Sequence, residues 1–409
     1  MRERIAVTGL GAFTPLGMDL DSSWRACLAG EGAIKTQKME PGEFGPEAFA
    51  MPVALPAGDP TPDLEAKLGR RIGASLDPFS LYALAAANEA ILDAKLPREA
   101  LARGSVIFGH GIGGVHTLEA GFERYFGKRS PRMHPLTVPK VMASAPVSAI
   151  AIEYGMRGPS FAVASACASA GHAMAQGALL LRAGLADLVI VGGSEAIASP
   201  GGLVGWDGLR AMSPSTCRPF SAGRDGMVIG EGAGALVLET ERHAGQRGAR
   251  PRAYLDGVGM SSDAVHWTQP DLDGAVASMR AACEQAGVIE ESALLISAHG
   301  TGTPLNDKNE AQAIHVVFGA HAMSHPVIAT KSAHGHLIGA SSAVQAALGL
   351  RALEAGKAPP ILNYLGPDPE CALNLVLEPR DIACRALLVN AFAFGGLNAS
   401  LVFRLPDAA

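Results

Sequence analysis

The chain has 409 residues, with 39 acidic against 33 basic side chains and a formal net charge of −6. A hydrophobic fraction of 48% against 18% charged residues indicates a large core, and the length allows two domain-sized units. The acidic balance argues against nucleic-acid binding, and the lack of a long uninterrupted apolar run argues against a membrane span. The start, MRERIAVTGLGAF, has no signal-peptide core and the six cysteines form no CxxC pair, so we expect a cytoplasmic protein.

In chain order, short apolar runs alternate with alanine-rich helical stretches, which is the pattern of an α/β fold with buried strands. A first set of strands is expected at residues 5–7, 106–108, 161–163, 188–191 and 235–238. A second set is expected at residues 254–257, 294–297, 327–330, 386–389 and 400–403.

The two sets of elements resemble each other. PSFAVASACASAGHAMAQGALLL and PVIATKSAHGHLIGASSAVQAALGL both predict a strand, a turn of small residues and a helix rich in Ala and Gly. We therefore expect an internal duplication, with an N-terminal half at 1–245 and a C-terminal half at 246–409 that meet in the polar stretch ERHAGQRGARPR. The alternative is that any α/β protein repeats strand, turn and helix by necessity.

Cys167 lies where a predicted strand ends and a helix begins. The unpaired N–H groups of a helix start favour a thiolate and can stabilise an oxyanion. A buried cysteine by itself is more often an inert small hydrophobic residue. The placement therefore predicts a nucleophile only if other reactive side chains converge on it.

Two histidines follow other predicted strands. His299 and His336 each lie in a glycine-framed turn, and Lys331 precedes His336 on the same segment. Strand ends are where α/β proteins place their sites. His334 and His336 could also indicate a metal site, but no Cys or carboxylate cluster with ligand spacing accompanies them, so no metal is expected. The sequence has no G-x-S-x-G elbow and no Walker A loop, and the glycines at 109–114 lack the dinucleotide spacing.

With these residues in place, the chain resembles a β-ketoacyl-acyl-carrier-protein synthase of the decarboxylating Cys-His-His class, in the thiolase superfamily. The resemblance runs through VTGLGAFTPLG, RGPSFAVASACASAG, RPFSAGRDGMVIGEGAGALVLE, GMSSDAVHWTQP, AHGTGTPLNDKNE, KSAHGHLIGA and NAFAFGGLN. It implies a five-layered αβαβα fold of two duplicated halves. It also implies a dimer in which the strand leading to the cysteine pairs across the two-fold axis, with a second copy or a paralogue as partner.

The resemblance implies roles for four residues in the reaction. Cys167 matches the nucleophile that takes the acyl group from a carrier-bound thioester. His299 and His336 match the two histidines that help malonyl-carrier protein lose CO2 and stabilise the enolate oxygen. Lys331 matches the lysine that orders this site.

Further residues are implied to support the site. Glu310 matches the usual carboxylate partner of that lysine, and Asp307 a further acidic position of the same loop. Thr301 and Thr303 match threonines that hydrogen-bond the phosphopantetheine arm. Phe394 matches the gatekeeper, whose backbone N–H joins that of the nucleophile in an oxyanion hole.

The implied partner is acyl carrier protein, and no cofactor is implied because the substrates carry phosphopantetheine on that carrier. Carrier proteins are acidic, so docking on a chain of net charge −6 requires a local basic patch. The candidates for this patch are Lys67, Arg70, Arg71, Arg129, Arg132 and Arg210. The alternative is that these side chains are scattered solvated charges.

Four positions depart from the usual fatty-acid enzymes: Ala393 replaces a glycine beside the gatekeeper, His334 a threonine, Gly302 a serine and Leu397 a threonine or serine. They favour a specialised type II pathway, such as aryl polyene or another polyketide, over a housekeeping fatty-acid role. A non-catalytic chain-length-factor partner has the same fold but typically lacks the nucleophile, so Cys167 favours an enzyme. A thiolase or a Cys-His-Asn starter synthase is disfavoured because the second catalytic position is histidine.

Overall fold

A ten-stranded mixed sheet forms the centre of the computed structural model, which describes residues 3–40, 47–291 and 294–407. Its strand order is β10-β9-β13-β14-β8-β1-β7-β6-β4-β5. All ten strands expected from the sequence lie in this sheet, most of them longer than expected. Their bounds are β1 Ile5–Phe13, β4 Ser105–Gly109, β5 Phe161–Val163, β6 Leu188–Glu195, β7 Gly232–Thr240, β8 Ala253–Ser262, β9 Leu295–Ser297, β10 Val327–Ile328, β13 Ala386–Ala393 and β14 Leu397–Arg404.

The two halves of the sheet have the same topology. Read from its outer edge inward, the N-terminal half runs β5-β4-β6-β7-β1 and the C-terminal half runs β10-β9-β13-β14-β8, so each strand has a counterpart in chain order. The halves join where β1 and β8 pair antiparallel, with Ala6 opposite Tyr254 and Val7 opposite Ala253. The repeated order confirms the expected duplication. The boundary expected at residue 245 falls in the short helix α10 (Glu241–Gln246) and stays a prediction.

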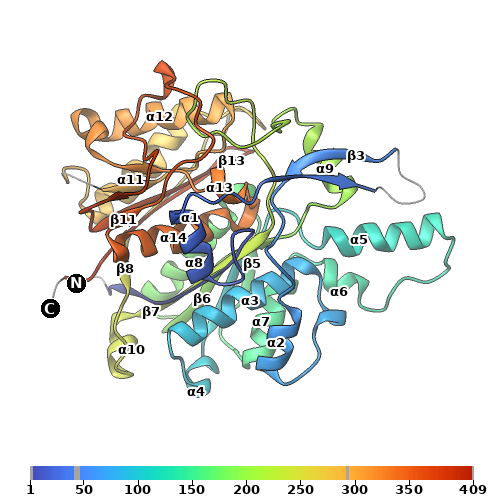
Figure 1. The fold of residues 1–409 in the computed structure, drawn as a ribbon. Coiled ribbons are helices and arrows are strands. Elements are labelled where there is room, and N and C mark those ends of the chain that lie inside the picture. Colours follow the sequence, from blue (N-terminus) through green and yellow to red (C-terminus); the bar gives the residue numbers. More distant parts are fainter. Residues whose placement is uncertain (1–2, 41–46, 292–293, 408–409) are drawn as a thin grey trace.

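Helices cover both halves and fill the space between them (Figure 1). In the middle, α8 (Ser169–Arg182) packs on β4 and β6, while α14 (Ser341–Ala355) packs on β7 and β13, and the two helices contact each other. The outer faces carry α3 (Pro78–Asp93) with α7 (Ala145–Tyr154) and α11 (Leu272–Ala286) with α12 (Pro304–Phe318). The result is the five-layered αβαβα arrangement that the resemblance implies.

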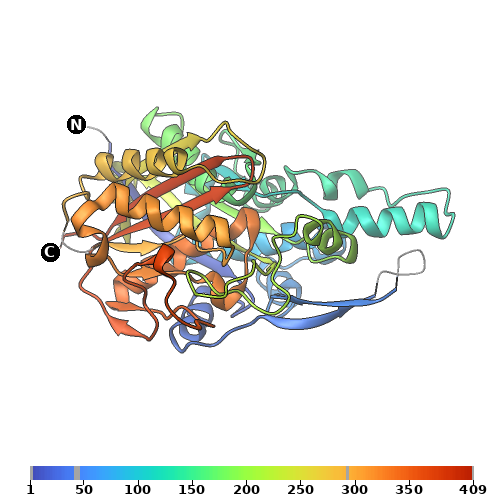
Figure 2. The same cartoon turned by 90° about the horizontal axis from the view of Figure 1, so that it is seen from above.

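The remaining elements lie around this body. The helices are α1 Leu20–Leu28, α2 Thr61–Leu68, α4 Arg98–Leu101, α5 Val115–Phe122, α6 Thr137–Val141, α9 Pro200–Asp207 and α13 Lys331–His334. Two small antiparallel pairs are β2 (Lys35–Met39) with β3 (Phe49–Val53) and β11 (Lys357–Ala358) with β12 (Arg380–Asp381). Figure 2 shows α5 and the β2–β3 pair extending from the body in the same direction. Among the helices of the described ranges, none has the length and apolar character needed to cross a membrane.

Candidate active site

Cys167 lies in a strained turn between β5 and α8. The turn is the 3₁₀ segment η3 (Ala166–Ala168), and Ala166, which precedes the cysteine, has a φ of 48°. A non-glycine residue in this left-handed region is uncommon and costs energy. Ser169 holds the turn, because its hydroxyl accepts from the backbone N–H of Ser165 at 2.8 Å and donates to the carbonyl of Ala166 at 2.7 Å. The thiol is thereby placed at the start of α8.

The imidazole of His336 contacts this thiol, with Nε2 lying 3.0 Å from Cys167 Sγ. The other ring nitrogen, Nδ1, lies 2.8 Å from Ser341 Oγ and accepts from the backbone N–H of Ile338 at 3.2 Å. A backbone N–H can only donate, so Nδ1 is an acceptor, and we assign the ring proton to Nε2. A ring N–H therefore points at the sulfur.

His299 completes the group. Its ring stands nearly perpendicular to that of His336, with the centroids 5.4 Å apart, and lies 6.0 Å from the ring of Phe392. The sulfur of Cys167 and one nitrogen of each imidazole all lie within 4.8 Å of one another. The fold thus brings together three buried residues that are far apart in the sequence.

Burial dominates the electrostatics of this group. It raises the pKa of the Cys167 thiol to about 12, although the ammonium of Lys331 and the backbone N–H groups of Phe394 and Cys167 favour the thiolate. Desolvation thus outweighs the helix start, which was expected to lower this pKa. Burial, followed by the charge of Lys331, holds the pKa values of His299 and His336 well below the usual range. Both imidazoles are therefore neutral at neutral pH, each with one N–H to donate.

Lys331 is 1% exposed and its ammonium makes two hydrogen bonds. One goes to the carbonyl oxygen of His299 at 2.5 Å, the other to Oε1 of Gln345 at 2.8 Å. The carboxylate of Glu310, the implied partner, instead accepts from the backbone N–H groups of His299 and Gly300, both at 2.8 Å. Among the described residues, no ion pair joins Lys331 to Glu310. The expectation that Glu310 bonds this lysine directly is therefore wrong. Burial lowers the pKa of Lys331, and the charge of Glu310 opposes this shift.

Asp307 fixes the turn that follows His299. Its carboxylate accepts from the backbone N–H groups of Phe220 at 2.7 Å, Thr301 at 3.1 Å and Gly302 at 3.3 Å. The carboxyl group is fully buried, which raises its pKa, while these donors favour the ionised form. Asp307 therefore shapes the loop without reaching the thiol.

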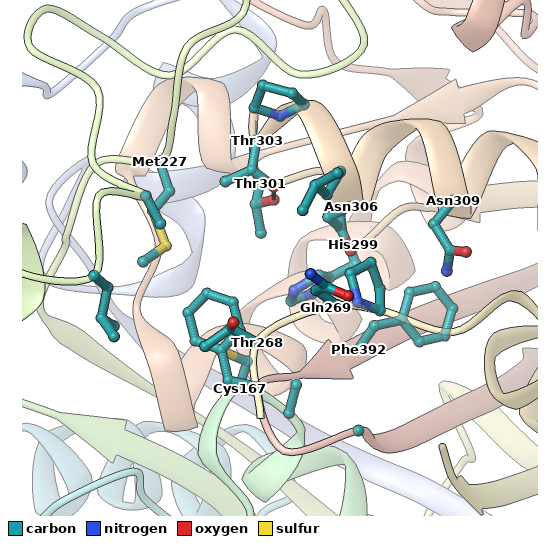
Figure 3. A pocket seen from close by; sticks show the side chains of 18 of the residues that line it. Cys167, Met227, Thr268, Gln269, His299, Thr301, Thr303, Asn306, Asn309 and Phe392 are labelled. Atoms are coloured by element: carbon teal, nitrogen blue, oxygen red, sulfur yellow. Dashed lines mark hydrogen bonds between the residues drawn. The ribbon is translucent and has the colours of Figure 1, made fainter. Parts of the chain in front are cut away.

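A cavity of about 330 Å³ opens onto Cys167 and both histidines. Figure 3 shows Thr301 and Thr303 on its wall, and their hydroxyl oxygens lie 2.9 Å apart. Cavities of this kind bind small molecules or flexible arms. Further lining residues come from several loops: Arg210, Met227, Asp263, Thr268, Gln269, Asn306, Asn309 and Asn398.

Phe394 borders the cavity directly after β13. Its ring stacks on that of Trp206, with the centroids 6.5 Å apart and the planes at 28°. The next residues, Gly395 and Gly396, have φ values of 85° and 73°, which glycine adopts without steric cost. The backbone N–H of Gly395 donates to the carbonyl of Trp267 at 2.7 Å. The glycine turn is thus tied to the loop that faces it.

Cysteine and histidine atoms this close could in principle hold zinc. The hydrogen bond at His336 argues against this, because zinc binds a bare ring nitrogen and Nε2 carries the proton when Nδ1 accepts from Ile338. Elsewhere in the described ranges, no group of three or more His, Cys or acidic side chains meets the same spacing. The expectation of no metal stays a prediction.

The proposed docking residues are all exposed and differ in their surroundings. Lys67 pairs with Asp63 at 2.7 Å, Arg70 pairs with Glu153, and Arg210 lines the cavity. The other basic side chains lie after α2 and between η2 (Glu123–Gly127) and α6: Arg71, Arg129 and Arg132. Arg210 is therefore the one among the six that borders the cavity.

Comparison with protein families gives two matches along the chain. The model of the β-ketoacyl synthase N-terminal domain matches residues 2–244, and that of the C-terminal domain matches residues 252–365. The chain belongs to the β-ketoacyl synthase family. Its fold and the placement of Cys167 between strand and helix agree with this assignment.

Curated relatives match over almost the full length of this ketosynthase. Nodulation protein E of Rhizobium meliloti (strain 1021) is 39% identical, covering 99% of this chain and all of the relative. The 3-oxoacyl-[acyl-carrier-protein] synthase 2 of Staphylococcus aureus (strain COL) is 34% identical, covering 99% of each chain.

Solved structures give the same result. The ishigamide ketosynthase/chain length factor superposes with a TM-score of 0.91 at 32% identity over all of both chains. The AntDE:AntF complex, described as a type II PKS acyl-carrier protein with its ketosynthase bound to the hexaketide, gives 0.87 at 26% identity, covering 99% of this chain and all of the other. These neighbours are ketosynthases, which confirms the thiolase-like fold class.

Three side chains of the site were missed in the sequence. Ser341 contacts Nδ1 of His336, Gln345 bonds Lys331, and Asn390 donates to Glu310 at 3.1 Å. Of these three residues, Gln345 could have been recognised in the sequence, because its long amide side chain is surrounded by small and aliphatic residues of the same helix. Ser341 and Asn390 look like ordinary residues of a helix start and a strand.

Proposed function

We propose that the chain is a β-ketoacyl-acyl-carrier-protein synthase, which joins an acyl group held on Cys167 to malonyl-carrier protein and releases CO2. The observation that carries this proposal is the contact of 3.0 Å between His336 Nε2 and Cys167 Sγ, with His299 beside it and a cavity above. A thiol with two neutral imidazoles suits acyl transfer followed by stabilisation of an enolate.

In the first step, the sulfur of Cys167 attacks the carbonyl carbon of a carrier-bound acyl thioester. The new C–S bond forms, the bond to the phosphopantetheine sulfur breaks, and that sulfur leaves with the proton that Cys167 gives up. The backbone N–H groups of Phe394 and Cys167 both lie at the reacting sulfur, where they can donate to the developing oxyanion. A thioester is exchanged for a thioester, so the acyl group stays reactive.

In the second step, malonyl-carrier protein loses CO2. The C–C bond to the carboxylate breaks and its electron pair moves into an enolate, whose oxygen accepts from the N–H groups of His299 and His336. The enolate carbon then attacks the acyl carbon on Cys167, and the cysteine sulfur leaves. Neutral imidazoles are suited to this task, because they donate a hydrogen bond without releasing a proton at neutral pH.

We extend the proposal to two macromolecular partners. Acyl carrier protein would dock at the cavity mouth, where Arg210 offers a positive charge to an acidic partner. A second ketosynthase chain, identical or a paralogue, would cover the edge strand β5 and the arm formed by α5 and η2. Phe161 on that edge is 38% exposed and Phe126 on the arm is 70% exposed, and such apolar surfaces mark interfaces.

The pathway is proposed as fatty-acid or type II polyketide synthesis in the cytoplasm, for example of an aryl polyene. Relatives and neighbours of both kinds, a 3-oxoacyl synthase and a type II polyketide ketosynthase, support this range. The chain-length-factor alternative is disfavoured, because Cys167 is present and in contact with His336. The reaction as written needs no metal or further cofactor.

The test is to incubate the purified protein with acyl-carrier protein and then with malonyl-carrier protein, and to follow both by intact mass. Wild type should gain one acyl mass at Cys167, release CO2 and give a β-ketoacyl carrier. Cys167→Ala should give neither adduct nor product, and Cys283→Ala in α11 serves as the matched control at another buried thiol. Acylation of a different cysteine, or of none, would refute the assignment.

A further inference from the structure

The glycine-rich segment 109–114 follows β4, and the proposed reaction does not use it. A Cβ built on Gly111 would lie 2.7 Å from Cγ2 of Ile338 and 2.9 Å from Oε2 of Glu195. Both distances are too short for a real Cβ atom, so the backbone of this segment approaches the two residues directly. A loop of the N-terminal half, the end of β6 and the turn before α14 therefore meet at one point.

The carboxylate of Glu195 lies at this junction. Glu195 is the last residue of β6 and is fully buried. Its Oε2 accepts from the backbone N–H groups of Gly111 at 2.6 Å and Gly339 at 3.0 Å. Its other oxygen, Oε1, has no hydrogen-bond partner among the described residues. A single oxygen atom thus bonds backbone from both halves of the chain.

The turn that Glu195 bonds is strained and leads to a catalytic histidine. This turn, η5 (Ile338–Ala340), begins with Ile338 at a φ of 41°. A β-branched residue in this region persists only where its surroundings hold it. The N–H of Ile338 donates to Nδ1 of His336 at 3.2 Å, and this bond leaves the ring proton on Nε2, which faces Cys167. The position of the turn therefore determines which nitrogen of the imidazole can donate.

The hydrogen bonds of Glu195 benefit the site, whereas its charge does not. Burial raises the pKa of the Cys167 thiol, and the negative charge of Glu195 adds to this rise, so it disfavours the thiolate. Burial also raises the pKa of Glu195 itself to about 7, although the backbone N–H groups of Gly111, Gly339 and Ile112 favour its ionised form. A carboxyl group keeps an acceptor oxygen in both protonation states. The two bonds through Oε2 can therefore persist on either side of neutral pH.

We infer that Glu195 is a positioning residue for His336: its Oε2 fixes the turn at Gly339 against the loop at Gly111, and this keeps the Nε2–H group of the imidazole directed into the site. The inference rests on the proposed function and adds a residue to which that proposal assigns no role. Glu195 is not one of the described residues that line the cavity, so it acts through the turn and not on the substrate.

Two substitutions separate the reach of this side chain from its charge. Glu195→Gln keeps the length and one acceptor oxygen for the two N–H groups, and it removes the charge. Glu195→Asp keeps the charge but is one carbon shorter, which withdraws the oxygen from both donors. The matched controls are Glu239→Gln and Glu239→Asp. Glu239 is a buried carboxylate at the opposite end of the β6–β7 pair, where it bonds Thr8 and Arg247.

The first test needs no activity. Hydrogen exchange, followed by mass spectrometry, reports on the peptides that contain residues 109–114 and 336–342. We expect Glu195→Asp to speed exchange in both peptides by about tenfold or more, since each loses a hydrogen bond to a charged group. Glu195→Gln should stay within about threefold of wild type, because the acceptor is kept. Unchanged exchange in Glu195→Asp, or equally fast exchange in the Glu239 variants, would overturn the inference.

The second test compares the two chemical steps. Glu195→Asp should lower CO2 release from malonyl-carrier protein by about tenfold or more, because the His336 donor is displaced, and should lower acylation of Cys167 less. Glu195→Gln should retain CO2 release within about threefold and acylate no more slowly than wild type, since the thiolate is no longer disfavoured.

The outcomes of the second test are distinct. Equal losses of CO2 release in Glu195→Gln and Glu195→Asp would show that the charge acts and the two bonds do not, which would overturn the positioning role. A wild type that releases no CO2 would refute the proposed function instead. Hydrogen exchange would then still decide whether Glu195 holds the turn.

Discussion

The turn before α8 and the turn before α14 occupy equivalent places in the two halves. Each is a short 3₁₀ segment, η3 (Ala166–Ala168) and η5 (Ile338–Ala340), and each begins with a non-glycine residue at positive φ, 48° and 41°. Each is followed by a helix that begins with a serine. At the second position, however, the N-terminal turn has Cys167 and the C-terminal turn has Gly339.

The connections that lead into these turns differ as well. Residues 164–165 join β5 to η3, whereas residues 329–337 join β10 to η5 and include the short helix α13. The longer connection carries Lys331 and His336. The hydroxyl of Ser169 donates to the backbone of its own turn, whereas the hydroxyl of the equivalent Ser341 contacts the ring of His336. The same scaffold thus supplies a nucleophile from one half and its histidine partner from the other, and they meet because α8 and α14 are in contact.

The strongest prediction separates the contributions of the two halves. Cys167→Gln should still release CO2 from malonyl-carrier protein but make no β-ketoacyl product, because the thiol only holds the acceptor. His299→Ala and His336→Ala should each lower CO2 release by about 10²–10³-fold, the usual effect of removing an oxyanion donor. Radiolabelled CO2 release and product mass measure the two steps. Decarboxylation at the wild-type rate in either histidine variant would contradict the assigned roles.

A substitution at Gly339 tests how strongly the C-terminal turn constrains the site. A Cβ there would lie 2.4 Å from Cα of His110 and 2.6 Å from the backbone nitrogen of Gly111, so the turn would have to shift. We expect Gly339→Ala to cost roughly 1–3 kcal/mol of unfolding free energy, as overpacking does in cores, and to lower CO2 release by displacing His336.

Denaturant titration measures the stability change. Gly245→Ala in α10 is the matched control, since a Cβ at that position meets nothing within 4 Å. If Gly339→Ala unfolds at the wild-type midpoint, the close approach at this turn does not constrain the site.

Much of this architecture could be predicted from the sequence, for physical reasons. Most strands of the sheet are buried on both faces, so they are continuous apolar runs, and Cys167, His299 and His336 stand out at or near the strand ends. The short pairs β2–β3 and β11–β12 were missed, because their strands are largely exposed or only two residues long.

Contacts inside the site were harder to predict. The resemblance implied Glu310 as the partner of Lys331. In the structure the Glu310 carboxylate accepts from two backbone N–H groups, and the ammonium of Lys331 donates to the amide oxygen of Gln345. Which atom of a buried polar side chain faces which neighbour depends on helix rotation and strand register. Neither can be read from residue types along the chain.

Lys331 and the two histidines should affect the pH dependence of CO2 release in different ways. Burial lowers the pKa of Lys331, so this side chain loses its charge at a lower pH than an ordinary lysine, and CO2 release should fall on the alkaline side. The pKa values of His299 and His336 lie well below the usual range, so the histidines should cause no acid fall near pH 6. Rates measured from acid to alkaline pH test both limbs. The Lys331→Met variant should release CO2 more slowly than wild type and show no fall on the alkaline side. If its CO2 release still falls at the same alkaline pH as in wild type, another group titrates there.

The smallest effect is expected at the gate, where β13 ends. Ala393 pairs with Leu397 and belongs to the apolar cluster around Cys167, and within the described ranges it is not among the residues with positive φ. Alanine therefore fits the turn as it stands. Its cost would arise only if the turn swings into a conformation with positive φ at this residue to admit an acyl chain, at roughly 1–2 kcal/mol.

Ala393→Gly removes that cost and should speed acylation of Cys167 by long saturated donors, by up to about tenfold for each 1.4 kcal/mol recovered. Short donors and CO2 release should change less, because they need less opening of the turn. Ala391→Gly, two positions earlier on the same buried strand, controls for the general effect of a glycine. Acyl-enzyme formation rates for short and long donors decide the matter. If Ala393→Gly and Ala391→Gly change all donors alike, the turn opens without positive φ at residue 393, and its freedom comes from Gly395 and Gly396 alone.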